Sequence, residues 1–296
     1  MNQKTLKKVI IVARHGPRAP IRQLSKLDQS FWKNLKTTDK NEIAVLAELT
    51  EKGRVFCREF GKKIKNDYHN KLNLNSDNVS FYSSKISRTQ DSAILVADEL
   101  CNKKLEITDL KFHESISADP DILFKNNKFN EFRKLTTSIE IDKEHHSTSE
   151  FLKKFINNHV GEIRTNNHFF DIRGTLECYC FEKIELPKII TSEILEDIEK
   201  CALSYYKNLF SHESLHYVGK NIHNFALHLL KYDPHKLVYL STHDTIIFPL
   251  SQHINSEHLQ LPKFCSNVKY ELFSDDSIDI YYDDVIIKTH HMNNIN

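Results

Sequence analysis

The sequence has 296 residues, of which 40% are hydrophobic, and a formal net charge of +1. A chain of this size can bury a core of ordinary size, in one large domain or in one domain with an insertion. The near balance of charges excludes a strong overall attraction to nucleic acid or to an anionic membrane. We therefore expect no nucleic acid as a binding partner.

No segment of the sequence approaches the ~20 consecutive apolar residues that a membrane-spanning helix needs. The apolar run that follows the basic N-terminus covers only Val9 to Ala13. A secretory signal needs roughly 7–15 apolar residues and a cleavage site with small residues. We therefore expect no membrane span and no signal peptide, which favours the cytoplasm unless the sequence is a mature form.

The six cysteines give an ordinary density for a chain of this length. No second pair of cysteines or histidines stands at the spacing that a zinc finger needs. Cys178 and Cys180 form a C-x-C sequence, which the alternation of a strand would place on one face. From composition alone we expect reduced thiols that are buried or half-buried.

In the first part of the chain, strand-like and helix-like segments alternate. An apolar, β-branched run at residues 8–13 predicts a strand that is covered on both faces. Gly16, soon after this run, indicates that the strand ends there. From Thr50 onward, apolar residues recur at helical spacing. Residues 79–83 predict a second strand, and a further helix begins near Arg88.

The rest of the chain predicts a helical segment followed by strands. Residues 115–210 lack strong strand runs and carry amphipathic helix patterns. The apolar run at 236–240 predicts another buried strand. Tight turns that contain aspartate join three further predicted strands, at 269–273, 277–282 and 285–288.

These elements together predict an α/β fold. We expect a three-layer core in which helices flank a mostly parallel sheet, together with a smaller and mainly helical insertion. Residues 1–114 and 211–296 are assigned to the core, and residues 115–210 to the insertion, which would act as a cap.

The first predicted strand runs directly into the sequence Arg-His-Gly-Pro-Arg-Ala-Pro. In open α/β folds, ligands bind beyond the carboxyl ends of the strands. Arg14 and Arg18 each carry a planar and permanently charged guanidinium that fits phosphate oxygens. Gly16 allows the backbone to approach a ligand closely. A phosphate bound by the two arginines would have its phosphorus beside the imidazole of His15.

A second polar segment follows the strand predicted at 236–240. His243 can donate a hydrogen bond to a phosphate oxygen, and the carboxyl group of Asp244 can protonate a leaving alkoxide. Such an acid contributes about 10²–10⁴-fold to the rate. Arg88 adds a cation at the start of a predicted helix, where anions are favoured.

This arrangement resembles the histidine acid phosphatase family, a branch of the histidine phosphatase superfamily. The motif R-H-G-x-R-x-P is matched by Arg14, His15, Gly16, Arg18 and Pro20. The resemblance implies a phosphoglycerate mutase-like fold, covers most of the chain and is weakest between about residues 115 and 170. Further similar segments occur in the same order: Leu49-Thr50 with Gly53, Ser84 to Thr89, Leu186-Pro187, Ser241 to Thr245, Leu261-Pro262 and Glu271-Leu272.

The resemblance implies a role for each matching side chain. His15 would be the nucleophile that forms a phosphohistidine, and Asp244 would be the proton donor. The implied phosphate-binding residues are Arg14, Arg18, Arg88 and His243. Because side chains supply the cations, the implied hydrolysis of a small-molecule phosphomonoester needs no metal and no cofactor.

Two alternative functions stay open at this point. The first is a phosphotransferase of the phosphoglycerate mutase branch, which also carries R-H-G but takes its acid from a glutamate elsewhere. In that branch the residue after the second histidine is usually small and uncharged, so Asp244 favours the phosphatase branch. The second is a non-catalytic protein that binds phosphate groups or partners, although every implied catalytic side chain is present.

Members of the family usually carry disulfides. Cys178 and Cys265 fall near the positions where the family tends to pair cysteines, so the resemblance implies a bond between them. The segment that links the two halves of the core is short for the family, so we expect a reduced cap.

Overall fold

The computed structural model describes residues 4–292 except 23, 29, 31, 33–45, 103, 120–128 and 214. Two compact units divide the chain. The first consists of Met1–Gly16, Gly53–Leu123 and His216–Asn296, and the second of Pro17–Lys52 and Phe124–Leu215. The sequence analysis places residues 17–52 in the core, and its domain boundaries remain a prediction.

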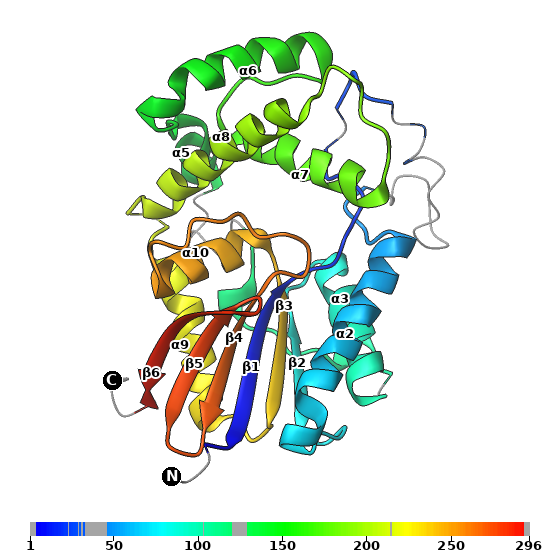
Figure 1. Ribbon diagram of the computed structural model, residues 1–296, viewed down its shortest axis with the longest axis vertical. Coiled ribbons are helices and arrows are strands. Elements are labelled where there is room, and N and C mark those ends of the chain that lie inside the picture. Colours follow the sequence, from blue (N-terminus) through cyan, green and yellow to red (C-terminus); the bar gives the residue numbers. More distant parts are fainter. Residues whose placement is uncertain are drawn as a thin grey trace. The chain divides into compact units, whose positions relative to one another are not determined.

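A six-stranded sheet forms the centre of the first unit, in the order β2-β3-β1-β4-β5-β6 (Figure 1). Strand β3 lies between β2 and β1 and runs parallel to both. The pairings of β1 with β4, β4 with β5 and β5 with β6 are antiparallel. The strands are β1 (Leu6–Arg14), β2 (Val79–Ser83), β3 (Leu237–Thr242), β4 (Asn267–Phe273), β5 (Ser277–Tyr282) and β6 (Val285–His291).

The α/β class is confirmed, but the expectation of a mostly parallel sheet is met only in part. Two of the described strand pairings are parallel and three are antiparallel. The tight turns after β4 and β5 are too short for the crossover that parallel strands need, so they force hairpins. Asp276 and Asp283 occupy these turns with φ of 61° and 51°, a left-handed conformation that aspartate tolerates better than most residues.

Helices cover both faces of this sheet, as expected for a three-layer core (Figure 1). Val9, Ile11 and Ala13 of β1 belong to a buried cluster with apolar side chains of α2 and α3. Ile10 and Val12 point to the opposite face, because side chains alternate along a strand, and on that face α9 and α10 contact β1. The helices are α2 (Glu51–Leu72), α3 (Ser87–Cys101), α9 (Tyr217–Tyr232) and α10 (Asp244–Ile254).

Close packing between α9 and α10 holds the helix that begins at Asp244. A Cβ atom added to Gly219 of α9 would lie 2.1 Å from the carbonyl oxygen of Pro249 in α10. Only glycine therefore allows the two helices to approach this closely. The absence of a side chain at Gly219 helps to fix the position of α10 and of the carboxyl group at its N-terminus.

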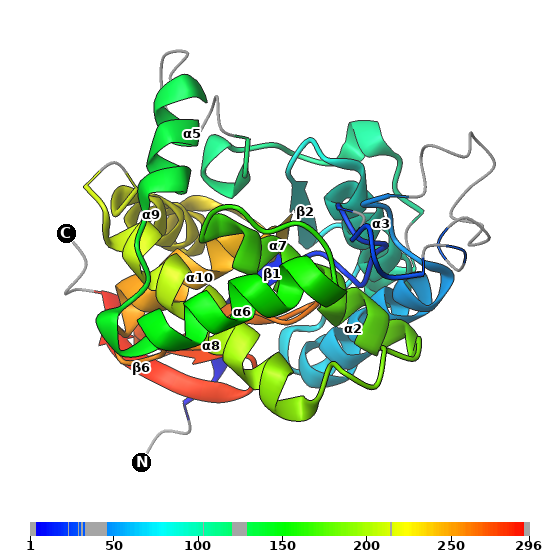
Figure 2. The same cartoon turned by 90° about the horizontal axis from the view of Figure 1, so that it is seen from above.

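The described part of the second unit is mainly helical, in agreement with the smaller helical insertion in the predicted fold class. Helix α7 packs against α8, and α6 also contacts α8 (Figure 2). Among the described residues of the chain, no helix combines the length and the hydrophobicity that crossing a membrane requires. The helices are α5 (Phe129–Ser138), α6 (His146–His159), α7 (Asn167–Glu182) and α8 (Ser192–Ser211).

The expectations for the cysteines need two corrections. Cys178 and Cys180 lie in helix α7 and not in a strand, so one thiol is buried and the other is exposed. The disulfide between Cys178 and Cys265 is absent, because all six cysteines are described and are free thiols. The thiol of Cys178 instead donates to the carbonyl oxygen of Gly174, one turn earlier in the same helix, at 3.1 Å.

Candidate active site

His15 and His243, the two histidines predicted for the site, lie at the same end of the sheet. Strands β1 and β3 are parallel neighbours, and Arg14 pairs in register with Thr242, so both strands end at the same level. The backbone N–H of His15 donates to the carbonyl oxygen of Thr242 at 2.9 Å. The rings of His15 and His243 are buried, with centroids 5.6 Å apart. The sheet thus brings together two residues that are far apart in the sequence.

A hydrogen bond fixes the tautomer of the His15 ring. The Nδ1 atom of His15 lies 2.8 Å from the carbonyl oxygen of Gly16. A carbonyl oxygen can only accept, so Nδ1 carries the proton and the lone pair of the neutral ring is on Nε2. Nε2 is therefore the ring nitrogen that can attack an electrophile.

Two further elements anchor the backbone around His15. The N–H of Cys265, in the loop before β4, donates to the carbonyl oxygen of His15 at 3.3 Å. The N–H of Gly16 donates to the hydroxyl of Ser92 on α3 at 2.9 Å. That hydroxyl donates to the carbonyl oxygen of Arg88, one turn earlier in α3, at 2.7 Å. The segment around His15 is therefore fixed from two sides.

Arg14 is fully buried and lies beside the acid. Its Nη2 atom forms an ion pair with Oδ2 of Asp244 at 2.9 Å, and its Nη1 atom donates to the carbonyl oxygen of Pro262 at 2.8 Å. Asp244 is the first residue of α10, where the helix dipole also stabilises a negative charge. Both surroundings favour the ionised carboxylate of Asp244.

Phe264 contacts this group of polar residues, although the sequence analysis does not predict it as a site residue. Its ring lies 4.4 Å from the centre of the Arg14 guanidinium, a cation–π contact, and 6.0 Å from the ring of His15. Phe264 thus packs against the predicted nucleophile and one predicted phosphate-binding residue. The available signal in the sequence was its place two residues after Pro262.

Arg88 lies next to His243, which belongs to the second polar segment predicted for the site. It is the second residue of α3 and is half-buried. Its Nη2 atom lies 3.3 Å from Nδ1 of His243. The structure therefore brings together five of the six residues predicted for the site, all in the first unit: Arg14, His15, Arg88, His243 and Asp244.

Arg18, the sixth predicted residue, belongs to the second unit. It forms a β-bridge with Leu49, and its Nη1 atom donates to the carbonyl oxygen of Ala19 at 2.9 Å. The same nitrogen lies 3.8 Å from the thiol of Cys178 in α7. Binding of phosphate by Arg18 remains a prediction, as do the roles of the other five residues.

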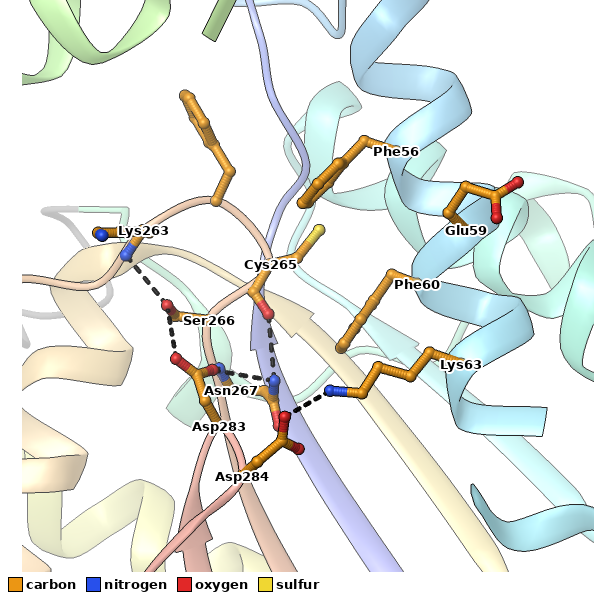
Figure 3. Close-up of a pocket in the computed structure, with 11 residues that line it drawn as sticks. Phe56, Glu59, Phe60, Lys63, Lys263, Cys265, Ser266, Asn267, Asp283 and Asp284 are labelled. Atoms are coloured by element: carbon orange, nitrogen blue, oxygen red, sulfur yellow. Dashed lines mark hydrogen bonds and ion pairs between the residues drawn. The ribbon is translucent and has the colours of Figure 1, made fainter. Parts of the chain in front are cut away.

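A hollow of about 420 Å³ is lined in part by Phe264 and Cys265, in the loop before β4 (Figure 3). Phe56 and Phe60 of α2 line it together with the C-terminal strands and turns. None of the six predicted site residues is among its lining residues, so this hollow is distinct from the predicted site. In the described part of the chain, no group of three or more His, Cys, Asp or Glu side chains is placed to hold a metal ion.

The sequence matches one protein family over more than half of its length. The model of the histidine phosphatase superfamily (branch 2) matches residues 5–171. No curated protein matches the sequence significantly.

Solved structures show the same fold at low sequence identity. The phytase from Citrobacter braakii is 13% identical with a TM-score of 0.65, over 93% of this chain and 84% of that chain. The phytase from D. castellii is 16% identical with a TM-score of 0.58, over 97% and 74%. A multiple inositol polyphosphate phosphatase from Bifidobacterium longum, in complex with phosphate, is 9% identical with a TM-score of 0.61, over 98% and 88%.

Proposed function

The chain belongs to the histidine phosphatase superfamily, branch 2, and is a histidine-type phosphatase; on this basis we propose that it hydrolyses phosphomonoesters in the manner of an acid phosphatase, through a phosphohistidine on His15. The hydrogen bond between Nδ1 of His15 and the carbonyl oxygen of Gly16 carries the proposal. It holds the proton on Nδ1 and leaves Nε2 as the nucleophile.

In the first step, Nε2 of His15 attacks the phosphorus in line with the ester bond. The bond between phosphorus and the ester oxygen breaks, and Asp244 gives its proton to the departing oxygen. The guanidinium groups of Arg14 and Arg88, with His243, stabilise the negative charge on the equatorial oxygens. The products are a free alcohol and a phosphoryl group on Nε2.

In the second step, water replaces the alcohol. The carboxylate of Asp244 takes a proton from the water as its oxygen bonds to phosphorus, and the bond between Nε2 and phosphorus breaks. Inorganic phosphate leaves, His15 returns to its neutral form, and Asp244 is protonated again. Division into two displacements replaces one difficult step by two easier ones.

The contact between Arg14 and Asp244 links catalysis to pH. The carboxyl group of Asp244 must be protonated before the first step, whereas its ion pair with Arg14 favours the ionised form. A phosphate dianion competes with the carboxylate for the Arg14 guanidinium and adds negative charge nearby, so both effects favour protonation of Asp244. We therefore expect an acidic pH optimum.

Release of phosphate from an aryl phosphate between about pH 4 and pH 8 tests the proposal. The wild-type protein should be active, and His15→Ala should abolish the activity because the nucleophile is removed. His69→Ala is a matched control, because His69 lies at the exposed end of α2, outside the predicted site. An inert wild-type protein, or an active His15→Ala variant, would contradict the proposal.

A panel of phosphomonoesters would identify the substrate. Sugar phosphates, nucleotides, phosphopeptides and inositol phosphates should all be included. The inositol phosphates are motivated by the solved structures named as phytases and as an inositol polyphosphate phosphatase. The ratio of kcat/KM values across the panel measures which ester the site prefers.

A further inference from the structure

Hydrogen bonds at both ring nitrogens define the tautomer of His243. Nη2 of Arg88 lies 3.3 Å from Nδ1, and Oγ of Ser84 lies 2.9 Å from Nε2. A guanidinium can only donate, so Nδ1 accepts from Arg88 and the proton of the neutral ring is on Nε2. The Nε2–H group of His243 therefore donates to the hydroxyl of Ser84.

The surroundings of Ser84 fix its hydroxyl as an acceptor toward the ring. Its oxygen also lies 3.4 Å from the backbone N–H of Ile86, which donates to it, and 2.7 Å from Oγ1 of Thr89. With both lone pairs used by His243 and Ile86, the O–H of Ser84 donates to Thr89. Thr89 in turn donates to the carbonyl oxygen of Ile86 at 2.7 Å. Ser84 and Thr89 are both buried, so this series of hydrogen bonds is shielded from water.

A hydrogen-bond acceptor at Nε2 is compatible with two protonation states of the ring. The neutral form of His243 and the imidazolium both carry a proton on Nε2. To donate from Nδ1 to a phosphate oxygen, the ring must carry a second proton on Nδ1 and become positively charged. A hydroxyl that accepts from Nε2 stabilises this charged form, because hydrogen bonds to charged groups are the stronger ones.

We propose that Ser84 is a positioning residue for the phosphatase reaction: it holds Nε2 of His243 and thereby directs Nδ1 toward the phosphate that Arg88 binds. This inference rests on the proposed function of the site. Ser84 lies in a segment that resembles the family, but the resemblance implies no role for its side chain. Its contact with His243 joins residues 159 positions apart in the sequence.

The variant Ser84→Ala tests this role through its pH profile. Without the acceptor at Nε2, the imidazolium is less stable, so kcat/KM near neutral pH should fall about 10- to 100-fold. The alkaline limb of the profile should move to lower pH by about one unit, whereas the acid limb should stay in place. Ser84→Thr keeps the hydroxyl and should restore most of the activity and the wild-type profile.

Ser83→Ala is the matched control. The hydroxyl of Ser83 lies 3.0 Å from Oγ1 of Thr89 and 2.8 Å from the carbonyl oxygen of Ser84, so its single proton can be donated to either, and Ser83 belongs to the same network. Neither of these hydrogen bonds reaches His243, so removal of the Ser83 hydroxyl should leave the alkaline limb unchanged. An unchanged profile in Ser84→Ala, or an equal shift in Ser83→Ala, would overturn the proposal.

Nitrogen NMR of the imidazole groups in the wild-type protein, without substrate, gives a test that is independent of activity and of the stability of any variant. The neutral ring of His243 should show its proton on Nε2. A proton on Nδ1 would overturn the proposal. This result stands even if the protein hydrolyses no ester, so failure of the proposed function and failure of this inference can be told apart.

Discussion

Arg14 and Asp244 form a buried ion pair in which Nη2 of the arginine lies 2.9 Å from Oδ2 of the aspartate. The predicted proton donor is thus in direct contact with a predicted phosphate-binding cation. In the proposed mechanism a bound phosphate competes with Asp244 for the Arg14 guanidinium, so the protonation of the acid is coupled to the presence of substrate. The role of Asp244 is therefore best tested with substrates that differ in their need for a proton.

The variant Asp244→Asn should separate substrates by their leaving groups. Asparagine keeps the shape of the side chain but cannot act as an acid. We expect kcat for alkyl phosphates to fall about 10²–10⁴-fold, and kcat for aryl phosphates to fall much less, because their leaving oxygens need little protonation. The two substrates serve as controls for each other, and equal losses would count against Asp244 as the proton donor.

The position of the site follows from strand order and was predictable. The residues after β1 and β3 meet because these two strands are parallel neighbours, so Arg14 and His15 lie beside His243 and Asp244. Arg88 joins them because β2 is parallel to β3 on its other side. A sequence that marks strand ends with polar motifs predicts this kind of convergence.

Contacts that depend on long-range packing could not be predicted. The ring of Phe264 and the hydroxyl of Ser84 reach the site through loops whose paths depend on the assembled sheet. The antiparallel direction of β4 relative to β1 could not be predicted either, since an apolar run gives no direction. The aspartate turns at Asp276 and Asp283 did carry the information for the two hairpins.

Stability should fall in acid, in part because of His223 on α9. The Nδ1 atom of this ring lies 2.9 Å from the hydroxyl of Tyr270. Burial, together with the nearby charges of His253, His290 and Lys288, lowers the pKa of His223 from 6.5 to about 4. The unfolded chain therefore takes up a proton more readily than the folded chain does. The stabilisation is complete above the unfolded value of 6.5 and is lost as the pH falls toward 4.

Urea unfolding at different pH values measures this effect. Between about pH 7 and pH 5, His223 should account for a loss of about 2 kcal/mol in the free energy of unfolding. His223→Gln removes the titrating group and should show a loss that is smaller by this amount. His253 and His290 titrate in both proteins, so the difference isolates His223. Equal losses in the two proteins would contradict the prediction.

The thiols offer a test of the cysteine assignments. Titration of the denatured and unreduced protein should count six free thiols. In the folded protein, Cys180 should react first because it is exposed. Cys201 should react slowly, since burial raises the pKa of its thiol to about 12. A count that is two short of six would show that a disulfide forms after all.

Two glycine substitutions should change stability in opposite directions. Gly219→Ala places a methyl group against the backbone of Pro249 and should cost about 2 kcal/mol or more, because α9 and α10 must separate. At Gly174 in α7 the nearest atom to an added Cβ is Nη2 of Arg18, at 3.9 Å. Gly174→Ala should therefore gain about 0.5–1 kcal/mol from helix propensity. Thermal unfolding of both variants checks the prediction, which fails if Gly219→Ala is as stable as the wild type.

Trapping of the phosphoenzyme tests the central claim most directly. The wild-type protein is mixed with an aryl phosphate, quenched in base during turnover and analysed by peptide mass spectrometry. We predict one phosphoryl group on the imidazole of His15, and none in His15→Ala. A phosphoryl group on another residue, or turnover of the substrate with no phosphorylated His15, would contradict the mechanism.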